Sequence, residues 1–121
     1  METFRFTKFP VYIASKHFYY TCLTVTNSFP RAYWELADQL RRAALSVCLN
    51  IAEGSAKYSD KDFKRFIENA LGSINESFAC LDIAKDHKLI KQNEFNDMQL
   101  EAESITKQLG GLSKKLRSTH Y

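Results

Sequence analysis

The chain has 121 residues, of which 45% are hydrophobic and 26% charged, a composition typical of one globular domain. Four glycines and two prolines are too few for the many turns of a β-sandwich or β-barrel, so an all-β fold is nearly excluded. A formal net charge of +3 allows an anionic partner without requiring one. The N-terminus lacks the apolar segment of a signal peptide, and no apolar run approaches the roughly 20 residues that span a membrane. We therefore expect a cytoplasmic protein without a membrane partner.

The first two predicted elements are amphipathic helices. The first spans about residues 10–26, because Pro10 suits a first helical position and apolar residues follow it at intervals of three and four. The second spans about residues 31–53, with a similar apolar stripe. Gly54 stands where a glycine would close this second helix just past its last turn.

The third and fourth predicted elements are longer helices. The third spans about residues 59–86 and opens on Ser59-Asp-Lys-Asp62, a variant of the capping box. The fourth spans about residues 91–116. We expect it to continue through Gly110-Gly111, because its heptad pattern does not break there, although each glycine weakens a helix by about 1 kcal/mol. That pattern consists of Phe95, Met98, Ala102, Ile105, Leu109, Leu112 and Leu116.

The predicted helices are joined by short connections of roughly four to six residues, which favour antiparallel neighbours. No segment shows the alternating pattern of a strand. The predicted fold is therefore all-α, a single antiparallel up-down-up-down four-helix bundle over residues 1–121.

No motif in the sequence predicts a catalytic or metal site. Cys22, Cys48 and Cys80 are odd in number and lack CxxC or CxxH spacing, so we expect reduced, packed thiols. A di-iron bundle needs Glu-x-x-His pairs, but none of the three histidines has a glutamate three residues before it. No His-Glu-x-x-His, P-loop or GxGxxG motif occurs either. We expect a protein that is not an enzyme and that has no catalytic residue, metal or cofactor.

The first two helices carry a second apolar stripe beyond the one that a bundle core requires. At 100° per residue, these side chains lie about 100–180° from the core direction of their helices. Single surface hydrophobics are normal, but aromatic residues aligned on adjacent helices are typical of an interface. We therefore expect self-association. The predicted contact residues are Tyr12, Tyr19, Leu23, Trp34, Arg41, Leu45 and Leu49.

Basic residues gather at one predicted end of the bundle, where the chain start, the end of the second helix, the start of the third and the end of the fourth meet. Nine basic residues stand there against four acidic ones, a formal charge of +5 that leaves −2 for the remainder of the chain. We interpret this end as a surface for the phosphates of a polyanion, through backbone contacts rather than base readout. The alternative is a solvated charged face, in which Lys114 and Lys115 complement a helix C-terminus. The nine are Arg5, Lys8, Lys57, Lys61, Lys64, Arg65, Lys114, Lys115 and Arg117, and the four are Glu2, Glu53, Asp60 and Asp62.

Several blocks of the sequence follow one another in the order of a known family. They are Phe29-Pro30, Gln39-Leu-Arg-Arg-Ala-Ala44, Asn50-Ile-Ala-Glu-Gly54, Ser59-Asp-Lys-Asp-Phe63, Ala70-Leu-Gly-Ser73 with Glu76, and Leu89-Ile90. With these blocks the chain resembles the bacterial four helix bundle proteins, also called 23S rRNA intervening-sequence proteins, over nearly its whole length.

This resemblance implies a closed four-helix bundle that commonly assembles as a homopentameric ring. Some members are encoded within intervening sequences of large-subunit ribosomal RNA genes. A distant relative, the accessory protein of diversity-generating retroelements, is a basic pentamer that binds nucleic acid and a reverse transcriptase. The resemblance implies no catalytic residues.

The family motif also has a structural interpretation, which we favour. On a helical wheel Asn50 flanks the core stripe of the second helix, where it can bond a third-helix partner such as Ser73 or Glu76. Subunit pairing and RNA binding both remain open for Arg41 and Arg42. The motif residues with this expected structural role are Gln39, Arg41, Arg42, Asn50, Glu53, Gly54, Gly72, Ser73 and Glu76.

Two functional hypotheses follow, and an enzyme is the least favoured third. The first is a non-enzymatic, ring-forming protein whose partners are further copies of itself and ribosomal RNA or another nucleic acid. The second is an adaptor that binds a protein partner and has no affinity for nucleic acid. A steep loss of nucleic-acid binding with salt distinguishes the two.

Overall fold

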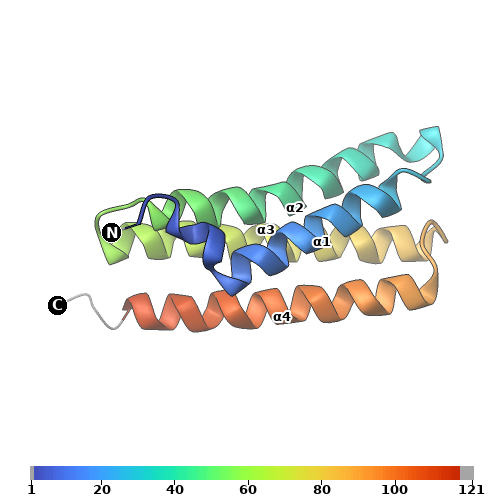
Figure 1. Cartoon of the computed structure of the whole chain (residues 1–121). Helices are drawn as coiled ribbons and strands as arrows, with labels where there is room; N and C mark the ends of the chain where they lie inside the picture. Colours follow the sequence, from blue (N-terminus) through green and yellow to red (C-terminus); the bar gives the residue numbers. More distant parts are fainter. Residues whose placement is uncertain (1, 118–121) are drawn as a thin grey trace.

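The computed structural model of the chain describes residues 2–117, and Arg117 through its backbone alone. Four long helices dominate it: α1 (Pro10–Thr26), α2 (Trp34–Ser55), α3 (Asp60–Asp86) and α4 (Gln92–Arg117). Two short 3₁₀ turns, η1 (Arg5–Lys8) and η2 (Arg31–Tyr33), precede α1 and α2. No strand occurs within residues 2–117. The prediction of an all-α four-helix bundle is confirmed (Figure 1).

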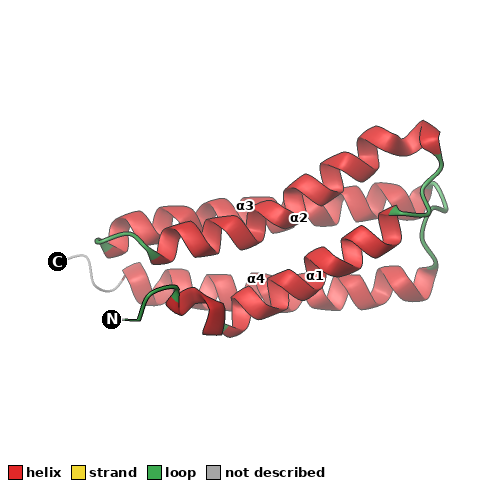
Figure 2. Ribbon diagram, turned by 45° about the horizontal axis from the view of Figure 1, so that its top comes forward, coloured by secondary structure: helices red, strands yellow, loops and turns green. Residues whose placement is uncertain are grey.

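Successive helices run in opposite directions (Figure 1). α2 packs against α3, α3 packs against α4, and α1 lies between α2 and α4, which closes the bundle. The connections are short loops at the two ends (Figure 2). As a result, the chain start, the α2–α3 turn and the end of α4 lie at the same end of the molecule.

The core is a continuous column of apolar side chains from all four helices. Its fully buried members include Phe18 of α1, Leu40 of α2, Ile67 of α3 and Leu109 of α4. The predicted heptad of α4 lines this column, with six of its seven residues buried and Leu112 packed against them. α4 also continues through both of its glycines, as the pattern predicted.

The start of α3 has the predicted cap. The Ser59 side chain accepts a hydrogen bond from the Asp62 backbone N–H over 3.1 Å, which satisfies one of the free donors of the first turn. α1 matches its predicted bounds, while α2 begins after a 3₁₀ turn and runs two residues beyond its predicted end.

Gly54 lies inside α2, so its predicted role of closing the helix is wrong. The helix ends at Ser55, and no glycine within residues 2–117 has a positive φ. Gly54 is buried against α3. A Cβ at this position would lie 2.8 Å from the Cβ of Phe66 and 2.9 Å from the Cδ1 of Phe63, inside normal contact distance. The glycine therefore permits a close approach of α2 and α3.

Candidate nucleic-acid interface and subunit-contact face

The fold brings together the segments that carry the nine predicted basic residues, and this region is called the basic end below. The 3₁₀ turn η1 packs against α2 as well as α1. Phe9, Pro10 and Val11 share a groove with Gly111, Leu112 and Lys115 of α4. The basic end is therefore one continuous region assembled from segments far apart in the sequence (Figure 1).

Arg5 is engaged within the fold. Its Nη2 donates a hydrogen bond of 3.1 Å to the carbonyl oxygen of Ser55, and its guanidinium lies over the rings of Phe9 and Phe63 at 5.4 and 5.8 Å. Its Nε is buried and makes no hydrogen bond within the described residues. Arg5 thus ties the N-terminal segment to the end of α2, whereas the sequence suggested only a surface cation.

Four of the predicted cations lie beside carboxylates of the same chain. One of these acids, Glu68, was not included in the sequence-based charge count, and adding it lowers the formal charge of the basic end from +5 to +4. Exposed pairs of this kind are worth roughly 0–1 kcal/mol each, so a phosphate can compete for the cations. The four pairs are Lys8–Glu2 at 3.1 Å, Lys57–Glu53 at 4.0 Å, Lys64–Glu68 at 2.8 Å and Arg65–Asp62 at 3.8 Å.

The remaining cations of the basic end are Lys61, Lys114, Lys115 and Arg117. The three lysines are exposed, and the side chain of Arg117 lies outside the described residues. Within residues 2–117, Lys61 and Lys114 form no ion pair. These two lysines are therefore the members of the set most open to an external anion.

The ring of Phe66 holds two cations together near the start of α3. The Nζ of Lys57 lies 4.9 Å from the ring centroid and the guanidinium carbon of Arg65 lies 4.8 Å from it. Cation–π contacts at partly exposed sites contribute about 0.5–1 kcal/mol each. Phe66 thus orients positive charge next to the α2–α3 turn.

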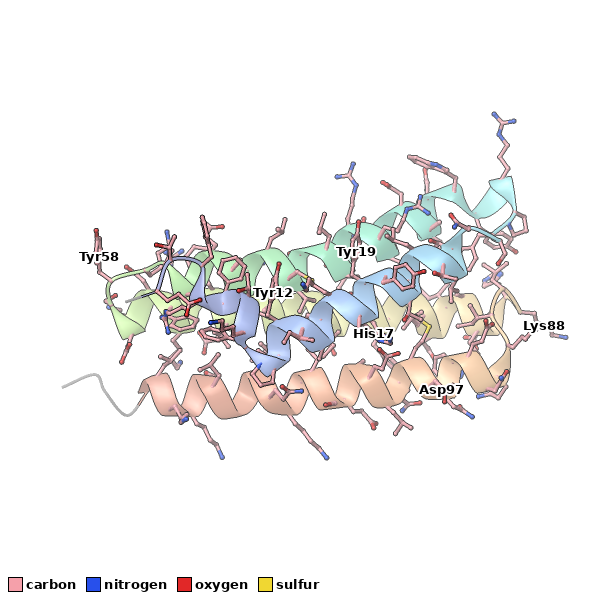
Figure 3. All side chains as sticks on the ribbon, in the orientation of Figure 1. Tyr12, His17, Tyr19, Tyr58, Lys88 and Asp97 are labelled. Carbon is pink, nitrogen blue, oxygen red and sulfur yellow. The ribbon has the colours of Figure 1, made fainter. Side chains whose placement is uncertain are left out.

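The predicted contact residues of α1 and α2 form a second feature, called the outward face below. Its α2 members are the more exposed: Trp34 is 60% exposed, Leu45 37% and Leu49 56%. The α1 members and Arg41 are half-buried, and Tyr12 and Tyr19 also pack against the core. Figure 3 shows Tyr12 and Tyr19 along α1, on the side next to α2. Ile13 and Tyr20 add further exposed apolar surface on α1.

The family motif forms a polar seam between α2 and α3. The Nε2 of Gln39 donates a hydrogen bond to a carboxylate oxygen of Glu76, and the hydroxyls of Ser46 and Ser73 lie 2.9 Å apart. Asn50 bonds Ser46 in its own helix, at the carbonyl oxygen and at the hydroxyl, so it reaches α3 through Ser46 and not directly. Ser46 is the linking residue that the sequence analysis did not single out.

The other motif residues have varied positions. Arg42 pairs with Asp38 at 2.9 Å within α2, and Glu53 lies beside Lys57. Gly72 is exposed, and a Cβ there would meet no atom within 4 Å. Nothing in the structure explains a glycine at position 72.

A metal site, a reactive thiol and a membrane-spanning helix each have requirements that can be checked in the described residues. Within residues 2–117 no group of three or more His, Cys, Asp or Glu side chains is placed to hold a metal ion. The three cysteines are free and buried, and burial raises the pKa of Cys48 to about 11 and also raises the pKa values of Cys22 and Cys80. Among these residues no helix is both long and apolar enough to cross a membrane.

The fold and the seam define a small all-α protein, an antiparallel four-helix bundle with a basic end and an apolar outward face. The family model of the 23S rRNA-intervening sequence proteins matches residues 7–111, and the chain belongs to that family. No curated protein matches the sequence.

Proposed function

We propose that this protein is a non-enzymatic, self-associating protein that binds structured RNA through its basic end. The observation that carries the proposal is the concentration of positive charge at one end of the bundle, with Lys61 and Lys114 exposed beside a cluster of paired cations. Salt-sensitive contacts to phosphates supply most non-specific affinity for nucleic acids. The family name refers to intervening sequences of 23S rRNA, which is our reason for choosing RNA as the polyanion to test.

Self-association multiplies this charge. If copies of the chain join through the outward face, their basic ends contribute to one larger field, and each adds phosphate contacts to the same RNA. A homopentamer is the size that we propose, from the resemblance of the sequence. Trp34 is a residue type favoured at subunit contacts, and the exposed Leu45 and Leu49 add apolar surface that such a contact would bury.

The RNA proposal is tested by removing two positive charges from the basic end and, as a control, two from the opposite end. The test variant is Lys61→Gln with Lys114→Gln, and the matched control is Lys88→Gln with Lys91→Gln, both exposed lysines at the opposite end. Binding of a fluorescent RNA stem-loop is measured by anisotropy from roughly 50 to 200 mM salt. We expect the test variant to bind about tenfold more weakly and to lose about one unit of salt slope for each lysine, while the control keeps both values.

Two outcomes would reject this assignment. Equal losses in the test and control variants would show that only net charge matters. A wild-type protein without salt-dependent RNA binding would favour the second candidate function, a protein adaptor, for which the exposed outward face is the supporting observation.

The self-association proposal has its own experiment. Leu45→Asp with Leu49→Asp places two charges on the outward face, and Leu100→Asp is the control because Leu100 is 65% exposed on α4. Light scattering should show the double variant falling to the 14.0 kDa protomer mass, with helical circular dichroism retained and the control unchanged. A monomeric wild-type protein, or an unchanged mass in the double variant, contradicts the proposed face.

A further inference from the structure

A groove of about 810 Å³ lies at the basic end, between the N-terminal segment and the end of α2. Residues 2–6 line it on one side, and Leu49, Ala52, Glu53 and residues 55–58 line it on the other. This volume falls within the roughly 300–1,000 Å³ typical of small-molecule sites. The groove is thus large enough for a flat organic group.

Two exposed aromatic rings border this groove. Phe4 is 70% exposed, and Tyr58 is fully exposed at the turn between α2 and α3. Figure 3 shows Tyr58 projecting away from the bundle. Phe4 in turn packs edge-to-face on Phe6, with ring centroids 6.4 Å apart. An exposed aromatic face next to cations is the usual platform on which unpaired bases stack.

Hydrogen bonds fix the backbone at or beside both residues. Phe4 adopts a left-handed conformation with φ 59°, which is unfavourable for a bulky residue, and its carbonyl oxygen accepts hydrogen bonds from the N–H and hydroxyl of Thr7. Arg5, next in the chain, is bonded to Ser55. Tyr58 sits between Lys57, whose N–H bonds the Gly54 carbonyl oxygen over 3.1 Å, and the capping residue Ser59. Such strain at an exposed residue is typical of binding sites.

The charges around the groove suit a nucleotide. Lys57 lines it together with Glu53, and Lys8 lies 3.1 Å from Glu2 at its N-terminal side. The lysines can contact a phosphate, while the carboxylates can accept hydrogen bonds from the N–H groups of bases, such as N3–H of uracil. Glu2, Glu53 and nearby acids weaken the electrostatic attraction of a phosphate at this groove. Stacking on the aromatic rings would supply affinity that does not depend on charge.

We propose that this groove binds an unpaired nucleobase of RNA, stacked on Tyr58 and Phe4 with its phosphate beside Lys57. The inference rests on the proposed RNA-binding function and adds to it a preference for unpaired nucleotides. Leu49 belongs both to the groove and to the outward face, so the site lies where the two surfaces meet.

The experiment compares two RNA probes, an oligouridylate and a fully paired duplex with the same number of nucleotides. The variants are Tyr58→Ala, Tyr58→Phe, which keeps the ring, and Phe4→Leu, which keeps bulk but removes the ring. Leu100→Ala is the control for the loss of an exposed apolar side chain. Tyr58 makes a safe target because its side chain has no packing to lose.

We expect Tyr58→Ala to bind the oligouridylate about 5- to 150-fold more weakly, the range measured for loss of one base–aromatic stack. Phe4→Leu should weaken the same complex, while Tyr58→Phe and the control bind like wild type. Duplex affinity and oligomer mass should be unchanged in all four variants.

Each other outcome overturns the inference in a recognisable way. If wild type binds both probes and Tyr58→Ala changes neither affinity, the groove does not hold a base but the RNA-binding function stands. If Tyr58→Ala weakens both probes equally, the ring does not discriminate unpaired bases. A fall in oligomer mass assigns Tyr58 to a subunit contact instead. If wild type binds neither probe, the inference and the proposed function fail together.

Discussion

The close approach of α2 and α3 at Gly54 gives a prediction with a definite sign. In Gly54→Ala the new Cβ would lie 2.8 Å from the Cβ of Phe66, whereas carbon atoms make favourable contact at about 3.5 Å or more. Because that atom is fixed to the backbone of α3, the helices must separate by roughly 0.7 Å; no rotamer change can relieve the contact. Overpacking of this kind costs up to about 3 kcal/mol.

The intrinsic preference of helices opposes this cost. Alanine is favoured over glycine inside a helix by about 1 kcal/mol, so the net loss in Gly54→Ala is up to about 2 kcal/mol. Gly72→Ala is the matched control, since it makes the same change in α3 with no atom within 4 Å of the new Cβ. That control should gain about 0.5–1 kcal/mol.

Thermal unfolding followed by circular dichroism measures both effects. Unfolding entropy of about 2.1 cal/mol/K per residue converts 1 kcal/mol into about 4 °C for a chain of this length. Gly54→Ala should therefore melt below wild type by up to about 8 °C, and Gly72→Ala about 2–4 °C above it. The variants are compared at one protein concentration, with mass checked, because association shifts the midpoint. A Gly54→Ala midpoint raised like that of Gly72→Ala would refute the packing argument.

Three further predictions concern other parts of the fold. Ser59→Ala removes the cap of α3 and should lower the free energy of unfolding by about 1 kcal/mol in urea titrations, whereas Ser59→Asp should lose little; equal losses would contradict the capping role. Arg5→Ala should lower the free energy of unfolding by about 1.5–3 kcal/mol, the value of a hydrogen bond from a charged group, and should speed hydrogen exchange within residues 2–9. Unchanged exchange rates would show that Arg5 does not anchor this segment. Burial raises the pKa of Cys48 from 9.0 to about 11 in the folded chain, so the thiol of the unfolded chain ionises at lower pH. The contribution of this neutral thiol to the free energy of unfolding is complete below about pH 9 and is lost as the pH rises toward 11. Cys48→Ala should show a shallower alkaline loss in urea titrations at a series of pH values, and an identical slope would exclude the thiol as its cause.

The sequence determined the helices and their buried sides, because these depend on short-range chemistry. A 3.6-residue period places the side chains of α4 on one face whatever the helix packs against, and Ser59 caps a turn only three residues away. The antiparallel order followed from connections too short for any other path. Local ion pairs such as Lys64–Glu68 could also have been foreseen from their spacing of four residues.

The tertiary structure decided what lies between helices, because those distances depend on how closely and at what angle the helices pack. The sequence placed Gly54 at a helix end. In the structure Phe63 and Phe66 of α3 lie so close to this position that only a residue without a side chain fits there. Asn50 was expected to reach α3, and the helix spacing gives that contact to Ser46 instead. The groove between Phe4 and Tyr58 joins residues more than fifty positions apart and depends on a strained backbone at Phe4, which no sequence period encodes.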